Sequence, residues 1–172
     1  SMNARDADEG RSFLSKKGGS TKLGEKIVDE RVKIWTDPWN PEVPAAAWSP
    51  DGIARKRMDI IKDGTVANMF YDRYWAQQKN VAPNPFAANV IMEGGKASLE
   101  DMIKDTKRGV LVTRFWYIRM VDPQTLLYTG LTRDGIFYVE NGKIKHPVKN
   151  FRFNESPIIM LNNVETLGKQ NR

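Results

Sequence analysis

Hydrophobic and polar residues alternate along several stretches of the chain, with the period of two that is typical of half-buried β-strands. This alternation predicts strands over residues 32–36, 58–61, 66–70, 110–121 and 136–144. Asp63-Gly64 and Asn141-Gly142 stand between such runs, and both dipeptides supply the positive φ angles that tight turns require. The sequence therefore predicts two hairpins and a sheet of antiparallel strands.

Two other stretches carry the 3.6-residue period of amphipathic helices. Ser98, followed by Asp101, is a capping-box start for a helix predicted over residues 99–107. Ser156 precedes a proline and begins a helix predicted over residues 157–167. We therefore expect an α+β fold of predominantly antiparallel β-sheet, in layered or sandwich-like form, with two short flanking helices.

The composition sets the size of the expected core. Of the 172 residues, 40% are hydrophobic, which is enough for a sizeable core in a single domain spanning 1–172. Residues 1–24 are rich in Gly, Lys and Ser, and we expect them to form a mobile, loop-rich segment. The N-terminus is too polar for a signal peptide and no apolar run reaches membrane-spanning length, so we expect a cytoplasmic protein without a membrane partner.

A basic surplus permits, but does not require, an anionic partner. The chain has 27 basic and 21 acidic residues, a net charge of +6. These charges are spread along the sequence, and a scattered surplus is more typical of a solvated surface than of a nucleic-acid footprint. The longest basic cluster, Arg55-Lys56-Arg57, is the candidate contact for nucleic acid or another anion, although we do not expect nucleic acid to be the main partner.

The stretch TRFWYIRM places Arg114 and Arg119 around three aromatic residues. Aromatic side chains beside arginines can stack on bases. On a regular strand, however, Phe115 and Tyr117 share one face while Trp116 and its neighbour Ile118 share the other. This pattern is typical of a core strand that is buried on both faces, and we favour that interpretation.

Candidate catalytic chemistry is sparse. The chain has no cysteine and one histidine, whereas a zinc centre needs three or four ligands, usually His or Cys. His146 precedes Pro147 in a predicted strand, which indicates a surface or pairing residue rather than a general base. We assign no catalytic residue and no metal ligand, and we expect no cofactor in this chain.

A series of blocks nevertheless resembles a known family. In chain order they read EGRSFLSKKG, IKDGTVANMFYDRYWA, IMEGG, RGVLVTRFWYIRMVDPQT and YVENGKIKHPVKNFRFNESPIIML. Together they resemble the C-terminal region of the TldD/PmbA proteins, zinc-dependent peptidases that are also called modulators of DNA gyrase. The resemblance implies longer cytoplasmic proteins with an additional N-terminal domain, whose paired subunits mature or degrade peptides.

The family's zinc site does not carry over. The resemblance implies a helical His-Glu-x-x-x-His motif and a cysteine near the C-terminus, and this sequence contains neither. No catalytic residue of the family can be placed on this chain. The resemblance therefore implies zinc in other members of the family, and we expect no self-contained activity in this chain.

Our leading hypothesis is a non-catalytic C-terminal domain that serves subunit pairing and peptide docking. Extended peptides would dock along exposed strand edges. The partner would be a homologous subunit or a second copy, with a homodimer expected in isolation, and the candidate interface residues are Tyr71, Tyr74, Trp75 and Trp116. The alternative is a nucleic-acid-associated regulator of the gyrase-modulator type. An independent enzyme is disfavoured because metal ligands are lacking.

Overall fold

The computed structural model describes residues 2–170 and has the expected α+β fold with antiparallel sheets. Its elements divide between two compact units, which are described separately. Unit 1 comprises residues 2–93 with 123–125, and unit 2 comprises residues 94–122 with 126–170. Four short helices occur within the described residues, rather than the two that were predicted. None of them is long and apolar enough to span a membrane.

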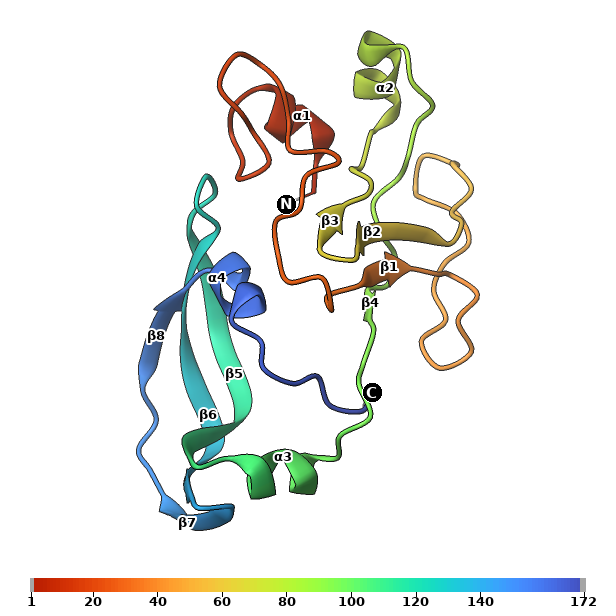
Figure 1. The fold of residues 1–172 in the computed structure, drawn as a ribbon. Helices are drawn as coiled ribbons and strands as arrows, with labels where there is room; N and C mark the ends of the chain where they lie inside the picture. Colours follow the sequence, from red (N-terminus) through yellow and green to blue (C-terminus); the bar gives the residue numbers. More distant parts are fainter. Residues whose placement is uncertain (1, 171–172) are drawn as a thin grey trace. The chain divides into compact units, whose positions relative to one another are not determined.

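Unit 1 contains a small antiparallel sheet with the strand order β3-β2-β1-β4 (Figure 1). The strands are β1 (Ile34–Thr36), β2 (Met58–Lys62), β3 (Thr65–Val66) and β4 (Ile91–Met92). Asp63 and Gly64 turn between β2 and β3 with φ angles of 50° and 74°, which confirms the first predicted hairpin. Gly64 is required there because an added Cβ would lie 2.3 Å from the carbonyl oxygen of Val28.

The strand predicted over residues 66–70 is shorter than expected. β3 ends at Val66, and the backbone of Phe70 instead exchanges hydrogen bonds with the N-terminal segment. The amide of Phe70 donates to the carbonyl of Met2, and the amide of Ala4 donates to the carbonyl of Phe70. The backbone of Phe70 thus pairs with a segment more than 60 residues away in the sequence. The local pattern of hydrophobic and polar residues does not reveal this pairing.

The core of unit 1 includes part of the segment that was predicted to be loop-rich. Residues 1–24 contain the helix α1 (Ala4–Asp8), which Asn3 caps through its side-chain oxygen. The buried face of α1 packs with residues from more distant parts of the chain in one hydrophobic cluster. This cluster consists of Ala4, Ala7, Leu14, Val66 and Met69. The second helix of unit 1, α2 (Arg73–Lys79), begins at the cap residue Asp72 and ends at Asn80, which adopts a left-handed conformation.

Unit 2 is built on two long antiparallel strands, β5 (Arg108–Asp122) and β6 (Leu127–Glu140) (Figure 1). Two shorter strands, β7 (Lys143–Pro147) and β8 (Arg152–Glu155), both pair with β6. Asn141 and Gly142 have φ angles of 48° and 74°, which confirms the second predicted hairpin. Pro147 is the last paired residue of β7, as expected for a residue without an amide hydrogen.

The prediction of a strand over residues 136–144 is wrong at both ends. β6 begins at Leu127, and the turn divides the predicted strand at Glu140. Asp134-Gly135 resembles a turn signal in the sequence, but it forms a bulge within β6, with φ angles of 63° and 127°. The bulge lets the strand continue through a dipeptide that usually ends one.

Both predicted helices of unit 2 are present but shorter. The helix α3 (Leu99–Asp105) has the expected capping box between Ser98 and Asp101. The helix α4 (Pro157–Asn162) ends five residues before the predicted end. The following chain pairs elsewhere: the amide of Gly95 donates to the carbonyl of Gly168, and the amide of Lys169 donates to the carbonyl of Ala97, each over 2.8 Å.

Candidate functional site

The most unusual feature of unit 2 is the outer edge of β5. β6 covers one edge of β5, while β7 and β8 both lie on the far side of β6. Within residues 2–170 no strand pairs with the other edge, which we call the open edge of β5. β5 has 15 residues, which corresponds to a length of about 50 Å at roughly 3.3 Å per residue. Unpaired backbone groups on such an edge can accept an additional strand.

A bulge in β5 changes which side chains share a face. Trp116 lies opposite Leu131 and Arg119 lies opposite Thr129, so Tyr117 and Ile118 together face the single residue Gly130. Tyr117 has a φ angle of 54° at this point. Strict alternation is lost here, because the extra residue shifts the side chains that follow it to the opposite face.

One face of the sheet carries arginines around two aromatic rings. The guanidinium carbons of Arg114 and Arg133 lie 4.6 Å and 5.0 Å from the centre of the Trp116 ring. Arg119 lies 4.4 Å from the centre of the Tyr117 ring and donates a 2.9 Å hydrogen bond to its hydroxyl. We call this surface the arginine face, and its residues are Arg114, Trp116, Tyr117, Arg119, Arg133 and Arg152.

The arginine face has more positive than negative charge. Arg114 donates to the carboxylate of Asp134 over 2.6 Å, and Arg133 lies 3.6 Å from the same carboxylate. Arg152 donates to the hydroxyl of Thr129 over 3.1 Å. Among the described residues, neither Arg119 nor Arg152 forms an ion pair, so four guanidinium groups share one carboxylate.

The opposite face opens into an apolar cavity of about 550 Å³. Its lining residues come from β5, β6, β8 and α4, and they are Phe115, Ile118, Tyr128, Phe153, Asn154, Glu155, Pro157 and Met160. The rings of Phe115 and Phe153 meet edge to face, with centres 5.1 Å apart. Gly130 makes room for this contact, because an added Cβ would lie 2.5 Å from the end of the Phe153 ring.

The exposure of β5 overturns the interpretation of TRFWYIRM as a core strand. The aromatic and large aliphatic side chains of residues 115–121 are between 39% and 58% exposed, and they belong to Phe115, Trp116, Tyr117, Ile118, Met120 and Val121. The predicted division of faces is also wrong, since Tyr117 lies with Arg119, and Ile118 lines the cavity with Phe115. The sequence analysis missed Arg133 and Arg152, because only the pairing register places them with β5.

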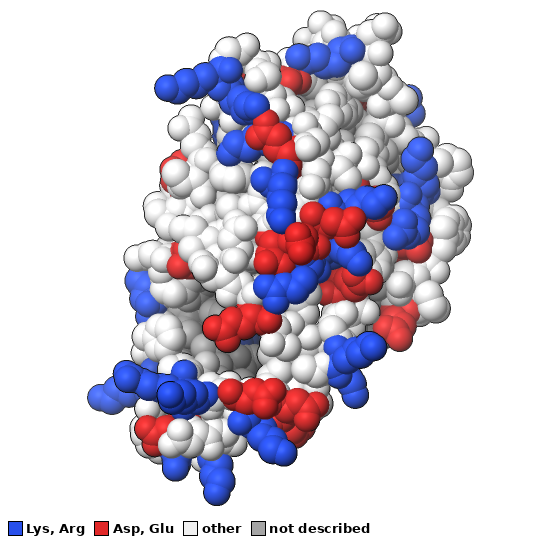
Figure 2. All heavy atoms as spheres, viewed as in Figure 1, with Lys and Arg blue, Asp and Glu red and all other residues white. Residues whose placement is uncertain are grey.

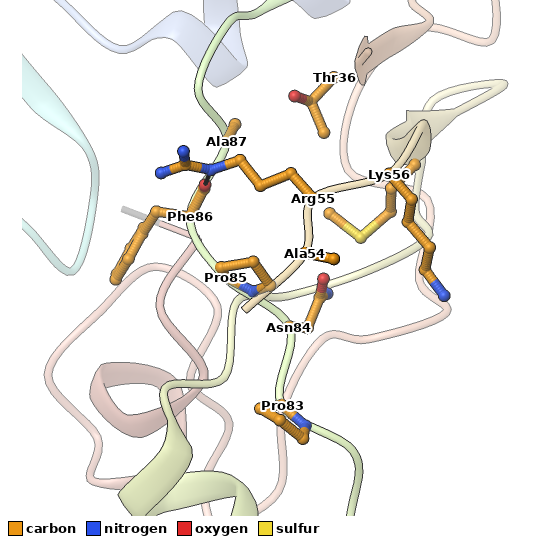
Figure 3. Close-up of a pocket in the computed structure, with 10 residues that line it drawn as sticks. Thr36, Ala54, Arg55, Lys56, Pro83, Asn84, Pro85, Phe86 and Ala87 are labelled. Carbon is orange, nitrogen blue, oxygen red and sulfur yellow. Dashed lines mark hydrogen bonds between the residues drawn. The ribbon is translucent and has the colours of Figure 1, made fainter. Parts of the chain in front are cut away.

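The basic cluster proposed for anion contact lies in unit 1 beside a smaller cavity of about 130 Å³ (Figure 3). Arg55 crosses this cavity and donates to the carbonyl of Phe86 over 3.2 Å. Its guanidinium group also donates to the carbonyls of Ala46 and Trp48. Arg55 thus connects three loop segments, and its donors are largely occupied by the protein's own backbone.

The two other residues of the basic cluster have different surroundings. Arg57 forms a 3.3 Å ion pair with Asp59 and lies over the ring of Trp35. Lys56 forms no ion pair within residues 2–170 and lines the cavity. On the face drawn in Figure 2, basic and acidic side chains are interspersed rather than gathered into one large patch. An extended electrostatic footprint is therefore not visible on this face.

The four candidate interface residues differ in exposure. Tyr71 and Trp75 are partly buried against the core cluster of unit 1, and burial raises the pKa of the Tyr71 hydroxyl. The indole nitrogen of Trp75 also donates to the carboxylate of Asp8 over 2.8 Å. Tyr74 is 59% exposed and Trp116 is 39% exposed. These two rings offer the most surface to a partner.

The ligand set does not fit a zinc ion. Residues 2–170 contain no group of three or more His, Cys, Asp or Glu side chains that could hold a metal. His146 stacks on the ring of Tyr138, with centres 5.4 Å apart, and its Nδ1 lies 3.1 Å from the carbonyl oxygen of Pro147. A single imidazole in this position cannot form a catalytic zinc centre, which takes three protein ligands.

Comparisons with known proteins agree on one family. The family described as PmbA/TldA metallopeptidase C-terminal domain matches residues 1–172. A protein named metalloprotease from Methanothermobacter thermautotrophicus is 23% identical over 88% of this chain and 36% of its own length. Metalloprotease PmbA from Escherichia coli O157:H7 is 26% identical over 85% of this chain and 33% of its own length. The chain thus spans about a third of the length of these relatives.

Solved structures share the fold. A protein described as a modulator of DNA gyrase from Bacteroides thetaiotaomicron is 27% identical, with a TM-score of 0.79 over 97% of this chain and 37% of that chain. TldE from Thermococcus kodakarensis is 22% identical, with a TM-score of 0.76 over 95% of this chain and 40% of that chain. The arrangement described above is thus similar to regions of larger proteins.

Proposed function

We propose that this chain, which belongs to the PmbA/TldA metallopeptidase C-terminal domain family, docks extended peptides and pairs with another subunit. We also propose that it supplies no catalytic residues of its own. The observation that carries this proposal is the open edge of β5, with which no other strand pairs within the described residues. Peptidase relatives act on peptides, and addition of a strand to such an edge is a common mode of peptide recognition.

The docking part can be tested with a fluorescein-labelled octapeptide of alternating threonine and valine. We expect this neutral peptide to bind, because its backbone can hydrogen-bond with β5. A matched peptide methylated on all its backbone nitrogens cannot donate, and it should bind at least about tenfold more weakly, a loss of roughly 1.4 kcal/mol. Fluorescence anisotropy measures both affinities. Equal affinity of the two peptides, or no binding of the unmodified one, would contradict docking at the edge.

The pairing part rests on exposed rings and apolar side chains. Contiguous apolar surface on a protein commonly marks an interaction site. Tyr74 and Trp116 are the most exposed of the candidate interface residues. A second copy of the chain, or a homologous subunit, is the partner that we propose, since a surface that pairs subunits can form a two-fold contact.

A second candidate function, binding of single-stranded nucleic acid, is favoured by the arginine face. Exposed aromatic rings beside arginines can stack on bases while the guanidinium groups neutralise phosphates. Yet both Arg114 and Arg133 already contact the Trp116 ring, which limits its access to a base. A salt titration with a labelled oligonucleotide tests this function, because charge-driven binding weakens steeply as the salt concentration rises.

A further inference from the structure

The open edge of β5 lies between two surfaces of opposite chemistry. The arginine face occupies one side of the sheet, and the apolar cavity opens on the other. In a β-strand, successive side chains point to opposite faces of the sheet. A peptide that adds to β5 would therefore direct alternate side chains toward the arginines and toward the cavity.

We propose that the open edge of β5 selects extended peptides in which acidic residues alternate with bulky apolar residues. This inference rests on the proposed docking of peptides and adds the class of peptide that is preferred. The acidic side chains would face Arg119 on β5, and the apolar side chains would enter the cavity beside Ile118.

Charge complementarity supports the acidic half of the pattern. Arg119 contacts only the hydroxyl and the ring of Tyr117. Within residues 2–170 its guanidinium group has no carboxylate partner. Hydrogen bonds between guanidinium and carboxylate groups are about twice as strong as those between neutral groups, so a glutamate on the docked strand would improve on these contacts.

The cavity supports the apolar half. Its volume of about 550 Å³ lies within the range of roughly 300–1,000 Å³ that is typical of ligand pockets. Most of its walls are aromatic or aliphatic, and Phe115, Ile118 and Met160 are each about half exposed. Glu155 also lines the cavity and would repel an acidic side chain on this side. An alternating peptide satisfies both surfaces, whereas a uniformly acidic one does not.

Four labelled octapeptides test the inference by fluorescence anisotropy at 0.15 M salt. The first alternates glutamate with phenylalanine, the second contains the same residues in two blocks, the third alternates lysine with phenylalanine, and the fourth is the neutral threonine–valine peptide. We expect the first to bind at least tenfold more tightly than each of the others. The protein is used at dilutions where light scattering shows a single species.

Substitutions separate the two surfaces. Arg119→Gln should weaken binding of the glutamate peptide several-fold without affecting the neutral peptide. Arg152→Gln is the matched control, because it removes the same charge from the same face but lies on β8, with β6 and β5 between it and the docked strand. A fifth peptide, which alternates glutamate with alanine, tests the cavity: wild type should prefer phenylalanine to alanine, and Met160→Trp should remove this preference by filling the cavity from its rim. Ile159→Trp is the matched control, because this residue is similarly exposed on α4 but does not line the cavity.

The outcomes distinguish the inference from the function on which it rests. If all four peptides bind equally well, the preference is wrong while docking stands. If even the neutral peptide does not bind, docking itself fails. If a ten-residue oligothymidylate displaces the glutamate peptide, and its binding is weakened equally by Arg119→Gln and Arg152→Gln, the arginine face is a nucleic-acid site and the inference is overturned. If Arg119→Gln prevents self-association but leaves binding of the glutamate peptide unchanged, the arginine face contacts a second copy of the chain, and the inference is also overturned.

Discussion

Units 1 and 2 use secondary structure in opposite ways. Unit 1 has short strands and long connecting segments, yet most of the buried apolar side chains belong to it, among them Leu14, Val28, Val32, Val66 and Met69. Unit 2 has the longest strands, but only Ile136 and Val139 are buried apolar residues there among those described. Long regular strands thus do not by themselves make a core, because a sheet also needs a second layer to cover its faces.

The difference indicates where each unit obtains its stability and where it has surface for other molecules. Unit 1 buries a cluster that joins α1 with residues near Val66. β5 in unit 2 keeps an open edge with arginines on one side and an apolar cavity on the other. Natural proteins usually cover long strand edges, and within the described residues no strand pairs with this one, although β5 has a bulge at Tyr117; we therefore expect a partner there.

The largest expected effect compares two glycines. Gly64→Ala should destabilise the protein by about 3 kcal/mol or more, since the new Cβ would meet rigid backbone atoms and φ is positive. Gly130→Ala in unit 2 should cost about 1 kcal/mol, because its Cβ meets the end of the Phe153 side chain, which can move into the cavity. Urea denaturation measures both. Equal losses would contradict the contrast between a packed and an open unit.

Two methionines provide a second comparison with identical chemistry. Met69 in unit 1 is 2% exposed, whereas Met120 on β5 is 49% exposed. Met69→Ala should lower the free energy of unfolding by about 3 kcal/mol through lost burial and a residual cavity. Met120→Ala should change it by no more than about 1 kcal/mol, because this side chain already contacts water. A large loss for Met120→Ala in urea denaturation would show that β5 is covered in solution.

Two tryptophans test whether the exposed surface of unit 2 pairs subunits. We expect a dimer at micromolar concentration. Trp116→Ala should raise its dissociation constant about tenfold, as loss of an interface ring commonly does. Trp75→Ala should mainly lower the stability of unit 1, since Trp75 packs on the core cluster and bonds to Asp8. Light scattering over a dilution series measures the dissociation constants, and urea denaturation measures the stability of the Trp75→Ala variant. A monomer at every concentration would exclude pairing.

The smallest expected effect concerns acid stability in unit 1. Arg31 donates to Asp29 over 2.7 Å through its side chain and 2.9 Å through its backbone amide, which holds the pKa of Asp29 well below its usual range. Because this pKa is lower in the folded chain, the contribution is present above the unfolded pKa of about 4 and is lost as pH falls toward the folded value.

Asp29→Asn should therefore reduce the urea midpoint slightly at pH 7 and progressively less as the pH falls below 4. Wild type and variant are compared by urea denaturation at pH 7, 4 and 3. A constant difference at all three values would show that the carboxylate charge does not account for the effect.

Local features followed from neighbouring residues. Asp63-Gly64 and Asn141-Gly142 form the predicted turns, and Ser98 with Asp101 forms the predicted cap, because these residues act on backbone groups within a few positions. The ordered series of sequence blocks also indicated the correct family.

The candidate site followed from distant contacts instead. Arg133 and Arg152 share the arginine face with residues of β5 only through the register of three strands. The bulge at Tyr117 changes the face of side chains that a regular alternation would place wrongly. The sequence of a strand indicates which residues alternate between the two faces of a sheet. It does not indicate whether a second layer covers those faces, or where a bulge moves a side chain from one face to the other. Those properties depend on pairing between segments far apart in the chain, so they became visible only in the folded structure.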